Sequence, residues 1–251
     1  YVMRDRGFAE ELMARAKAVG CPVLVLTVDL AVVGARYRDT RNGMGDSPTR
    51  VAQLRRGLDL VSHPGWVRRV PIAGKPLTFG NLAEVVPGAR TPEDFKEWVD
   101  AQFDPSVTWD DIAWVRENWK GKLVVKGVLD PEDARKAVDA GVDGVVVSNH
   151  GGRQLDAVPS TAAALPGVAE AVGDETTVLA DGGIRNGLDM VKMLALGAEA
   201  VIIGRAWAWA VAAEGQAGVE KMLRVLKSDA DVALALTGQN SVAGLGPDSL
   251  V

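Results

Sequence analysis

Five short apolar runs divide the chain, and each of them predicts a buried β-strand. The runs are rich in β-branched residues, and their apolar positions are continuous rather than alternating. Continuous apolar character is typical of strands that are buried on both faces of a parallel sheet. The runs cover residues 23–28, 123–126, 144–148, 177–180 and 200–204.

Helical patterns separate the last four of these runs, and one more precedes the first run. They cover residues 5–19, 130–140, 160–172 and 186–196. Pro131 suits the first turn of its helix, and Gly197 suits the residue that follows the last one. The alternation of strand and helix predicts βα units around a parallel sheet.

Polar residues follow the strand runs. In chain order they are Asp29, Lys126, His150, Asp181 and Arg205. Catalytic groups of a (β/α)8 barrel lie at the carboxyl ends of its strands, so this placement favours an α/β fold of the (β/α)8 TIM barrel class. A closed barrel of this class needs eight strands, whereas the sequence has five runs. We therefore expect residues 1–251 to form one barrel domain that lacks its first βα units in this chain.

The segment 43–109 interrupts the alternation and is too long for a plain βα loop. We interpret it as an insertion at the barrel mouth, which acts as a lid or faces a membrane. Within 50–75, basic residues are mixed with Leu, Val, Ile and Trp, as suits a segment that meets anionic lipid headgroups. The alternative is a solvated lid whose apolar residues pack on the barrel. The basic residues are Arg50, Arg55, Arg56, Arg68, Arg69 and Lys75.

Composition narrows the range of partners. The chain has 251 residues, 24% of them charged, and a net charge of -5 without a basic face, so we expect no nucleic-acid partner. It has no apolar run of the roughly 18 residues needed to span a bilayer. One cysteine, Cys21, and two histidines provide neither an internal disulfide nor a zinc cage, so no metal site is expected.

Two glycine-containing turns have the character of a phosphate site. Gly182 and Gly183 follow the fourth run, and Gly204 with Arg205 ends the fifth. Glycine lets backbone N–H groups approach an anion, and Arg185 or Arg205 would add a charge-assisted hydrogen bond. Each turn alone is equally consistent with a tight βα connection, but the two together favour phosphate binding.

His150 is the candidate proton acceptor, because it follows a strand and is flanked by a polar, glycine-containing stretch. Arg153, three residues further on, offers a planar guanidinium to a carboxylate. Asp29 would orient His150 and stabilise its imidazolium, or would cap the following segment. The other histidine, His63, lacks this context and is expected to be structural.

Lys126 ends an otherwise apolar strand, where a buried ammonium requires a negative charge nearby. A cofactor that becomes anionic on reduction would provide that charge. A salt bridge to Asp29 or Asp181 would provide it equally well.

These motifs together resemble the FMN-dependent α-hydroxy-acid dehydrogenase/oxidase family, which includes glycolate oxidase, flavocytochrome b2, mandelate dehydrogenase and bacterial L-lactate dehydrogenase. The resemblance extends over essentially the whole chain, and the block around His150 is its most specific part. The motifs are Thr27-Val28-Asp29, Gly34-Ala35-Arg36, Asp39-Thr40-Arg41-Asn42, Lys126-Gly127, residues 148–156 and Asp181-Gly182-Gly183-Ile184-Arg185.

The resemblance implies roles for the residues around the substrate. His150 would be the base that activates the substrate, and Asp29 would pair with it. Arg153 and Arg36 would hold the substrate carboxylate, and Tyr1 would donate a hydrogen bond to the substrate.

The resemblance also implies an FMN site. Lys126 would stabilise charge on the pyrimidine edge of the reduced flavin, and Thr27 and Ser148 would contact the same ring. The ribityl phosphate would be bound by Asp181, Gly182, Gly183, Arg185, Gly204 and Arg205.

Within the family, the segments 62–66, 80–81 and 103–106 are most similar to the bacterial quinone-linked L-lactate dehydrogenases, with mandelate dehydrogenase next. This implies oxidation of an L-2-hydroxy acid, L-lactate to pyruvate, with electrons passed to a membrane quinone or the respiratory chain. It further implies a homo-oligomer, usually a tetramer, and a cytoplasmic protein in peripheral contact with the inner or plasma membrane through 50–75. The alternatives are an oxygen-using 2-hydroxy-acid oxidase or a mandelate dehydrogenase with the same site, and a non-redox phosphate-binding isomerase or lyase.

Overall fold

The computed structural model describes residues 1–42, 49–74, 79–86, 88–89 and 92–250, which form two compact units. Unit 1 consists of Tyr1–Val32 and Asp104–Val251, and unit 2 is Val33–Phe103. Gly43, where the predicted insertion begins, and Lys75 lie outside the described residues. The division into one barrel domain with a lid or membrane-facing insertion at 43–109 stays a prediction.

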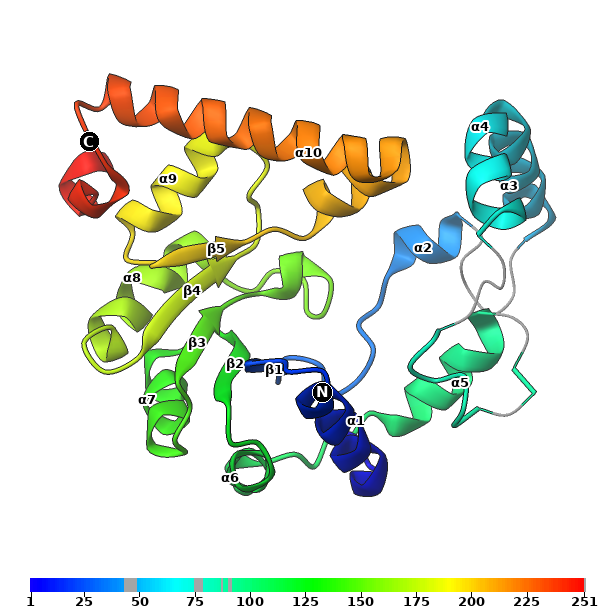
Figure 1. The fold of residues 1–251 in the computed structure, drawn as a ribbon, viewed down its shortest axis with the longest axis horizontal. Helices are drawn as coiled ribbons and strands as arrows, with labels where there is room; N and C mark the ends of the chain where they lie inside the picture. The colour runs from blue at the N-terminus through cyan, green and yellow to red at the C-terminus, as the bar shows by residue number, and fades with distance from the viewer. Residues whose placement is uncertain (43–48, 75–78, 87, 90–91, 251) are drawn as a thin grey trace. The chain divides into compact units, whose positions relative to one another are not determined.

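Unit 1 is built on a five-stranded parallel sheet whose neighbouring strands follow one another in chain order (Figure 1). Each strand coincides with one of the five apolar runs. The strands are β1 (Val23–Thr27), β2 (Lys122–Val128), β3 (Gly144–Val147), β4 (Thr177–Asp181) and β5 (Ala200–Ile202). Sequential parallel order is the arrangement that βα units produce, as predicted.

Three helices, α7, α8 and α9, connect β2 to β5 in turn and lie along one side of the sheet (Figure 1). The helices of unit 1 are α1 (Arg6–Ala18), α6 (Trp109–Asn118), α7 (Pro131–Asp139), α8 (Thr161–Val172), α9 (Gly187–Ala195) and α10 (Arg205–Leu236), with short 3-10 helices η2 (His150–Gly152), η3 (Val242–Gly244) and η4 (Pro247–Leu250). All four helices predicted from the sequence pattern are present.

Side-chain caps define where the connecting helices begin. Asp130, Ser160 and Asn186 accept N–H groups from the first turns of α7, α8 and α9 respectively. The long helix α10 changes direction at Gly215, whose φ of 61° and ψ of -136° suit glycine best. It packs against α9 (Figure 1).

The core of unit 1 lies along the middle strands. All four residues of β3 are buried, and Leu123 and Val125 of β2 are fully buried. The edge strands differ from the prediction that every strand is buried on both faces, since Val23 and Val25 of β1 are 45% and 46% exposed. Both side chains project from the same face of β1, which the described residues leave nearly half exposed. Two of the apolar side chains of β1 are therefore only partly buried by the described residues.

Unit 2 is helical. Its elements are α2 (Tyr37–Arg41), α3 (Arg50–Ser62), α4 (Pro64–Val67), the π-helix η1 (Arg68–Ile72) and α5 (Pro92–Gln102). Thr49 caps α3, and Phe79 meets Phe95 edge to face with ring centroids 5.4 Å apart. On α3, Val51, Leu54 and Val61 are exposed.

Asp143, just before β3, connects several groups at the amino-terminal edge of the sheet. Its carboxylate accepts hydrogen bonds from Lys122 Nζ at 2.7 Å, from the Leu123 N–H at 2.9 Å and from Arg116 Nη1 at 3.0 Å. Arg116 also donates to the carbonyls of Trp119 and Gly121. The hydrogen bond from Lys122 and then that from Leu123 lower the pKa of Asp143. This network ties α6 to β2 and β3.

We expect Asp143→Asn to lower the melting temperature at neutral pH, because a neutral amide loses the attraction to Lys122 and Arg116. The carboxyl pKa is lower in the folded chain than in the unfolded chain, so the carboxylate stabilises the fold above the unfolded pKa and this contribution is lost as pH falls. The difference in melting temperature between the two proteins should shrink between about pH 5 and pH 2.

Thermal unfolding followed by circular dichroism measures this difference. Asp133→Asn is the control, because it removes only the exposed pair with Lys136. A gap between wild type and Asp143→Asn that stays constant with pH would contradict the assignment.

Candidate active site

The carboxyl ends of β1 and β3 bring a histidine and a carboxylate together. His150 Nδ1 lies 3.0 Å from Asp29 Oδ1, and the two side chains are 22% and 16% exposed. Since an ionised carboxylate only accepts hydrogen bonds, Nδ1 is the donor and Nε2 remains available to take up a proton. The predicted pairing of His150 with Asp29 is therefore present in the structure.

The backbone around β2 makes this pairing possible. The register between β2 and β3 shifts between Lys126 and Val128, and Gly127 at the shift has φ +109°. A Cβ on Gly127 would lie 2.7 Å from both Cβ and Cγ of Asp29. Only glycine at position 127 leaves room for the Asp29 side chain to extend across β2 and contact His150.

His150 itself has an unusual backbone. Its φ of 54° lies in the left-handed region, which costs a residue with a Cβ free energy. The Ser148 hydroxyl accepts the N–H of His150 at 3.0 Å and helps to hold this conformation. Backbone strain of this kind gathers at functional sites.

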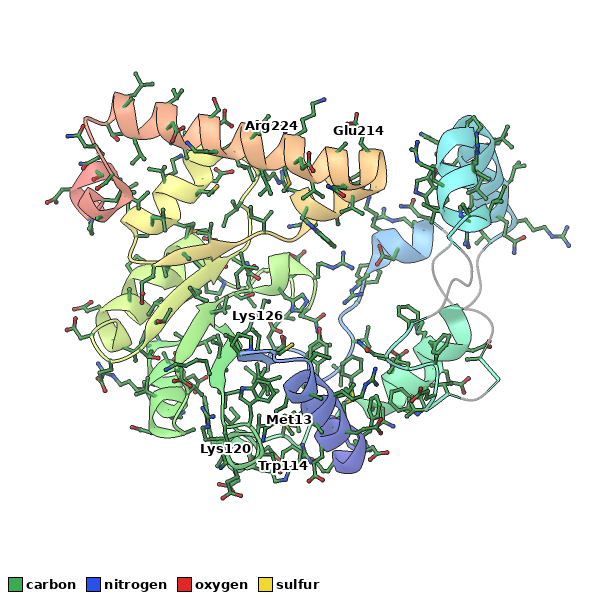
Figure 2. All side chains as sticks on the ribbon, viewed as in Figure 1. Met13, Trp114, Lys120, Lys126, Glu214 and Arg224 are labelled. Atoms are coloured by element: carbon green, nitrogen blue, oxygen red, sulfur yellow. The ribbon has the colours of Figure 1, made fainter. Side chains whose placement is uncertain are left out.

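Lys126 lies on β2, and its side chain is 15% exposed (Figure 2). Its ammonium is 3.1 Å from Asp181 Oδ2 and donates to Ser148 Oγ at 3.0 Å. The salt bridge to Asp181 that the sequence left open is present, so the protein itself supplies a negative charge to this lysine. Asp181 Oδ1 and Asp29 Oδ2 are buried without a hydrogen-bond partner among the described residues. Buried carboxylate oxygens of this kind are suited to receive hydrogen bonds from a ligand.

A cavity of about 400 Å³ lies next to the glycine turn that follows β4. We call it the turn pocket. It contains three of the predicted phosphate ligands, Gly182, Gly183 and Arg205. Arg205 Nη2 donates to the carbonyl of Gly151 at 3.1 Å. A Cβ on Gly151 would also lie 3.1 Å from Arg205 Nη2. The remaining lining residues include Asn149, Thr161 and Lys192.

Asp181, Arg185 and Gly204, the other predicted phosphate ligands, are not among the residues that line this pocket, and their role stays a prediction. Arg185 lines a different cavity, of about 300 Å³, together with residues of α10. Gly204 is the residue that precedes α10. Thr161 and Lys192 were missed by the sequence analysis, because a threonine at a helix start and a lysine on a helix are common and carry no motif of their own.

A second cavity in unit 1, of about 230 Å³, brings Tyr1 and Thr27 together. Its other walls include Val28, Asp104 and Trp109.

The remaining residues of interest lie elsewhere. Arg153 follows η2, three residues after His150 in the sequence, and is partly buried. Arg36 belongs to unit 2, so its predicted contact with a substrate carboxylate stays a prediction. His63 is exposed, and its Nδ1 lies 2.9 Å from the backbone oxygen of Asp59, which agrees with a local structural role.

Among the described residues, no group of three or more His, Cys, Asp or Glu side chains is arranged to hold a metal. None of the helices in the described ranges is both long enough and apolar enough to cross a membrane.

Comparison with known proteins decides the family. A model of the FMN-dependent dehydrogenases matches residues 1–251. The chain belongs to this family.

Named relatives agree with this. The L-lactate dehydrogenase of Caulobacter vibrioides is 55% identical over 245 residues, which cover 98% of this chain and 63% of that protein. The L-lactate dehydrogenase of Chromohalobacter salexigens is 50% identical over 251 residues, which cover 100% of this chain and 63% of that protein. The chain thus spans less than two thirds of the length of these relatives.

Solved structures give the same picture. The monotopic membrane protein (S)-mandelate dehydrogenase is 38% identical, with a TM-score of 0.89 over 99% of this chain and 65% of that one. Mandelate oxidase with (S)-4-hydroxymandelic acid is 37% identical, with a TM-score of 0.74 over 97% of this chain and 61% of that one. The family resemblance and the TIM-barrel fold class are confirmed, and the described residues contribute a five-stranded parallel sheet to this fold.

We expect Gly127→Ala to break the hydrogen bond between His150 and Asp29, because the new methyl group requires Asp29 to move. A ring N–H that donates to a carboxylate gives a strongly downfield proton NMR signal, which wild type should have and the variant should lose. Gly238→Ala is the matched control, since Gly238 also has positive φ (+72°) but open space around it. Retention of the downfield signal in Gly127→Ala would show that Asp29 does not need this glycine.

Proposed function

We propose that the protein oxidises an L-2-hydroxy acid, L-lactate to pyruvate, with FMN as its cofactor. The observation that carries this proposal is the hydrogen bond between His150 and Asp29 at the carboxyl edge of the sheet, where TIM barrels place their chemistry. The L-lactate dehydrogenases that are 50% and 55% identical to this chain support the choice of substrate.

The residues present fit FMN. The turn pocket offers Arg205 and the backbone of Gly182 and Gly183 to a phosphate, and Asp181 Oδ1 is a buried acceptor suited to a hydroxyl. Lys126, Thr27 and Ser148 are proposed to contact the flavin ring. When bound, FMN accepts the two electrons removed from the substrate and passes them to an external acceptor.

His150 has the central role among the protein groups. Oxidation of a 2-hydroxy acid to a 2-oxo acid releases two protons with two electrons, and Nε2 of His150 takes up one of those protons. Asp29 holds the ring by Nδ1 and stabilises the imidazolium that results. The chain supports both a route through hydride transfer and one through a carbanion, because His150 serves as the base in each.

Arg153 and Tyr1 are proposed to bind the substrate. A guanidinium matches the two oxygens of a carboxylate, and a phenol can donate to the hydroxyl or to the carboxylate. The neighbouring backbone supports this for Arg153, since it follows η2 directly and is tied to His150 by its own N–H.

Electrons are proposed to leave to a membrane quinone. On α3, Arg55 and Arg56 are exposed, as are Leu54 and Leu58, and on η1 Arg68 and Arg69 are exposed. This mixture suits peripheral contact with anionic lipid, and similarity to a monotopic membrane dehydrogenase supports it. A position at the cytoplasmic face of the membrane and a homo-oligomer such as a tetramer belong to the same proposal.

Similarity to mandelate oxidase favours one alternative, a hydroxy-acid oxidase in which oxygen is the electron acceptor. The two functions share every residue of the proposed site and differ only in the acceptor. Turnover of L-lactate with oxygen alone, at the rate reached with a quinone analogue, would favour the oxidase. The family match disfavours a non-redox isomerase or lyase.

We expect His150→Gln to keep bound FMN and to lower kcat for L-lactate by about 10²–10⁴-fold, because the proton acceptor is removed while the flavin contacts remain. Turnover with an artificial electron acceptor measures this, and the visible spectrum reports the flavin. His63→Gln is the matched control and should keep wild-type kcat. Near-normal turnover in His150→Gln would refute the assignment of the base.

Replacement of Arg55, Arg56, Arg68 and Arg69 by Gln should weaken binding to anionic vesicles by about 100-fold or more, since each charge near such a surface is worth about 1 kcal/mol. Sedimentation with phosphatidylglycerol vesicles measures this binding. The matched control replaces four exposed basic residues of unit 1, Arg135, Lys136, Lys221 and Arg224, by Gln. Equal loss in both variants would mean that the segment has no special role in membrane contact.

A further inference from the structure

Thr161 is a buried polar side chain that the proposed function does not use. It is 2% exposed, and its Oγ1 has no hydrogen-bond partner among the described residues. It lines the turn pocket. A hydroxyl buried without a partner costs free energy, so a ligand that accepts its hydrogen bond would recover that cost.

Thr161 is also the first residue of α8, a helix of 12 residues. Ser160 caps this helix by accepting the N–H of Ala163, whereas the N–H groups of Thr161 and Ala162 belong to the first turn and have no acceptor within the helix. The positive end of the helix dipole thus lies at the wall of the turn pocket, together with the unpartnered hydroxyl.

The position of Thr161 is matched to the glycine turn opposite. Gly182 has φ +93°, and a Cβ there would lie 2.9 Å from Thr161 Oγ1 and 3.2 Å from Asn149 Oδ1. The missing side chain at Gly182 therefore lets the start of α8 approach the turn after β4. The hydroxyl and the backbone of the glycine turn consequently face the same small space.

The charges around this space favour an anion. Lys192 of α9 and Arg205 of α10 contribute two cations to the turn pocket. Asp189 is the acid among its lining residues, and its Oδ2 already accepts the N–H of Arg185. Lys192 is exposed and forms no ion pair within the described residues. The combination of hydroxyl, helix start and two cations suits a phosphate monoester.

We propose that Thr161 and Lys192 bind the phosphate of the cofactor, together with Arg205 and the Gly182-Gly183 turn. This inference rests on the proposed function, since it takes the phosphate to be that of FMN. Thr161 donates its hydrogen bond to a phosphate oxygen, and the exposed Lys192 supplies a cation from the wall of the pocket.

The test compares FMN with riboflavin, which differs by the phosphate alone. Dissociation constants of both are measured by fluorescence titration of the flavin-free protein, for wild type, Thr161→Val and Lys192→Gln. Thr161→Ser restores the hydroxyl, and Lys120→Gln removes an exposed lysine elsewhere on unit 1 (Figure 2). Inorganic phosphate is titrated as a separate ligand.

We expect wild type to prefer FMN to riboflavin, and both Thr161→Val and Lys192→Gln to reduce this preference roughly tenfold or more. Thr161→Ser and Lys120→Gln should keep it. Without flavin, Thr161→Val should be no less stable than wild type, because the hydroxyl has no structural partner to lose.

Other outcomes would overturn the inference, and they separate it from the proposed function. An unchanged preference in both variants would leave FMN binding intact and remove Thr161 and Lys192 from the phosphate site. Weaker binding of inorganic phosphate with an unchanged FMN preference would assign the pocket to a free anion. If wild type bound neither flavin, the proposed function itself would fail.

Discussion

Two carboxylates at one edge of the sheet, whose side chains are 16% and 14% exposed, each have a basic partner, and the arrangement of the site follows from this pairing. Asp29 is paired with His150, and Asp181 is paired with Lys126. An unpaired charge in such surroundings would be costly, so each acid fixes the position of the base beside it. The partners come from four successive strands, which only a parallel sheet in chain order places side by side.

The two pairs have different consequences. Lys126 also donates to Ser148, and Ser148 accepts the N–H of His150, so the two pairs are joined through one buried hydroxyl. Each acid keeps one oxygen that is buried and lacks a partner among the described residues. Hydrogen bonds thus hold the side chains of the site in place, while one oxygen of each carboxylate can still accept a hydrogen bond from a ligand. A pre-organised binding site requires both features.

Much of this was predictable from the sequence. Continuous apolar runs with helices between them predicted the strands, and polar residues at the strand ends predicted Asp29, Lys126 and His150 as neighbours. Pattern alone left the partner of Lys126 open between a cofactor, Asp29 and Asp181, because distances across a sheet are not encoded in spacing.

Other features needed coordinates. The clash that requires glycine at 127 depends on a register shift in β2, which no local pattern signals. Thr161 became notable only because its hydroxyl is buried without a partner, and Arg185 proved to line a cavity with α10 rather than the turn pocket. The exposure of Val23 and Val25 on β1 depends on what packs against their face, which the strand's own sequence does not specify.

The central claim is that the His150–Asp29 pair serves oxidation of a hydroxy acid at a bound flavin. The most direct test is the visible spectrum of the FMN-supplied protein during anaerobic addition of L-lactate, with D-lactate as the control. The account predicts that the flavin absorption band is bleached by L-lactate and not by D-lactate. A bound flavin that stays oxidised with L-lactate, mandelate and glycolate alike would contradict it.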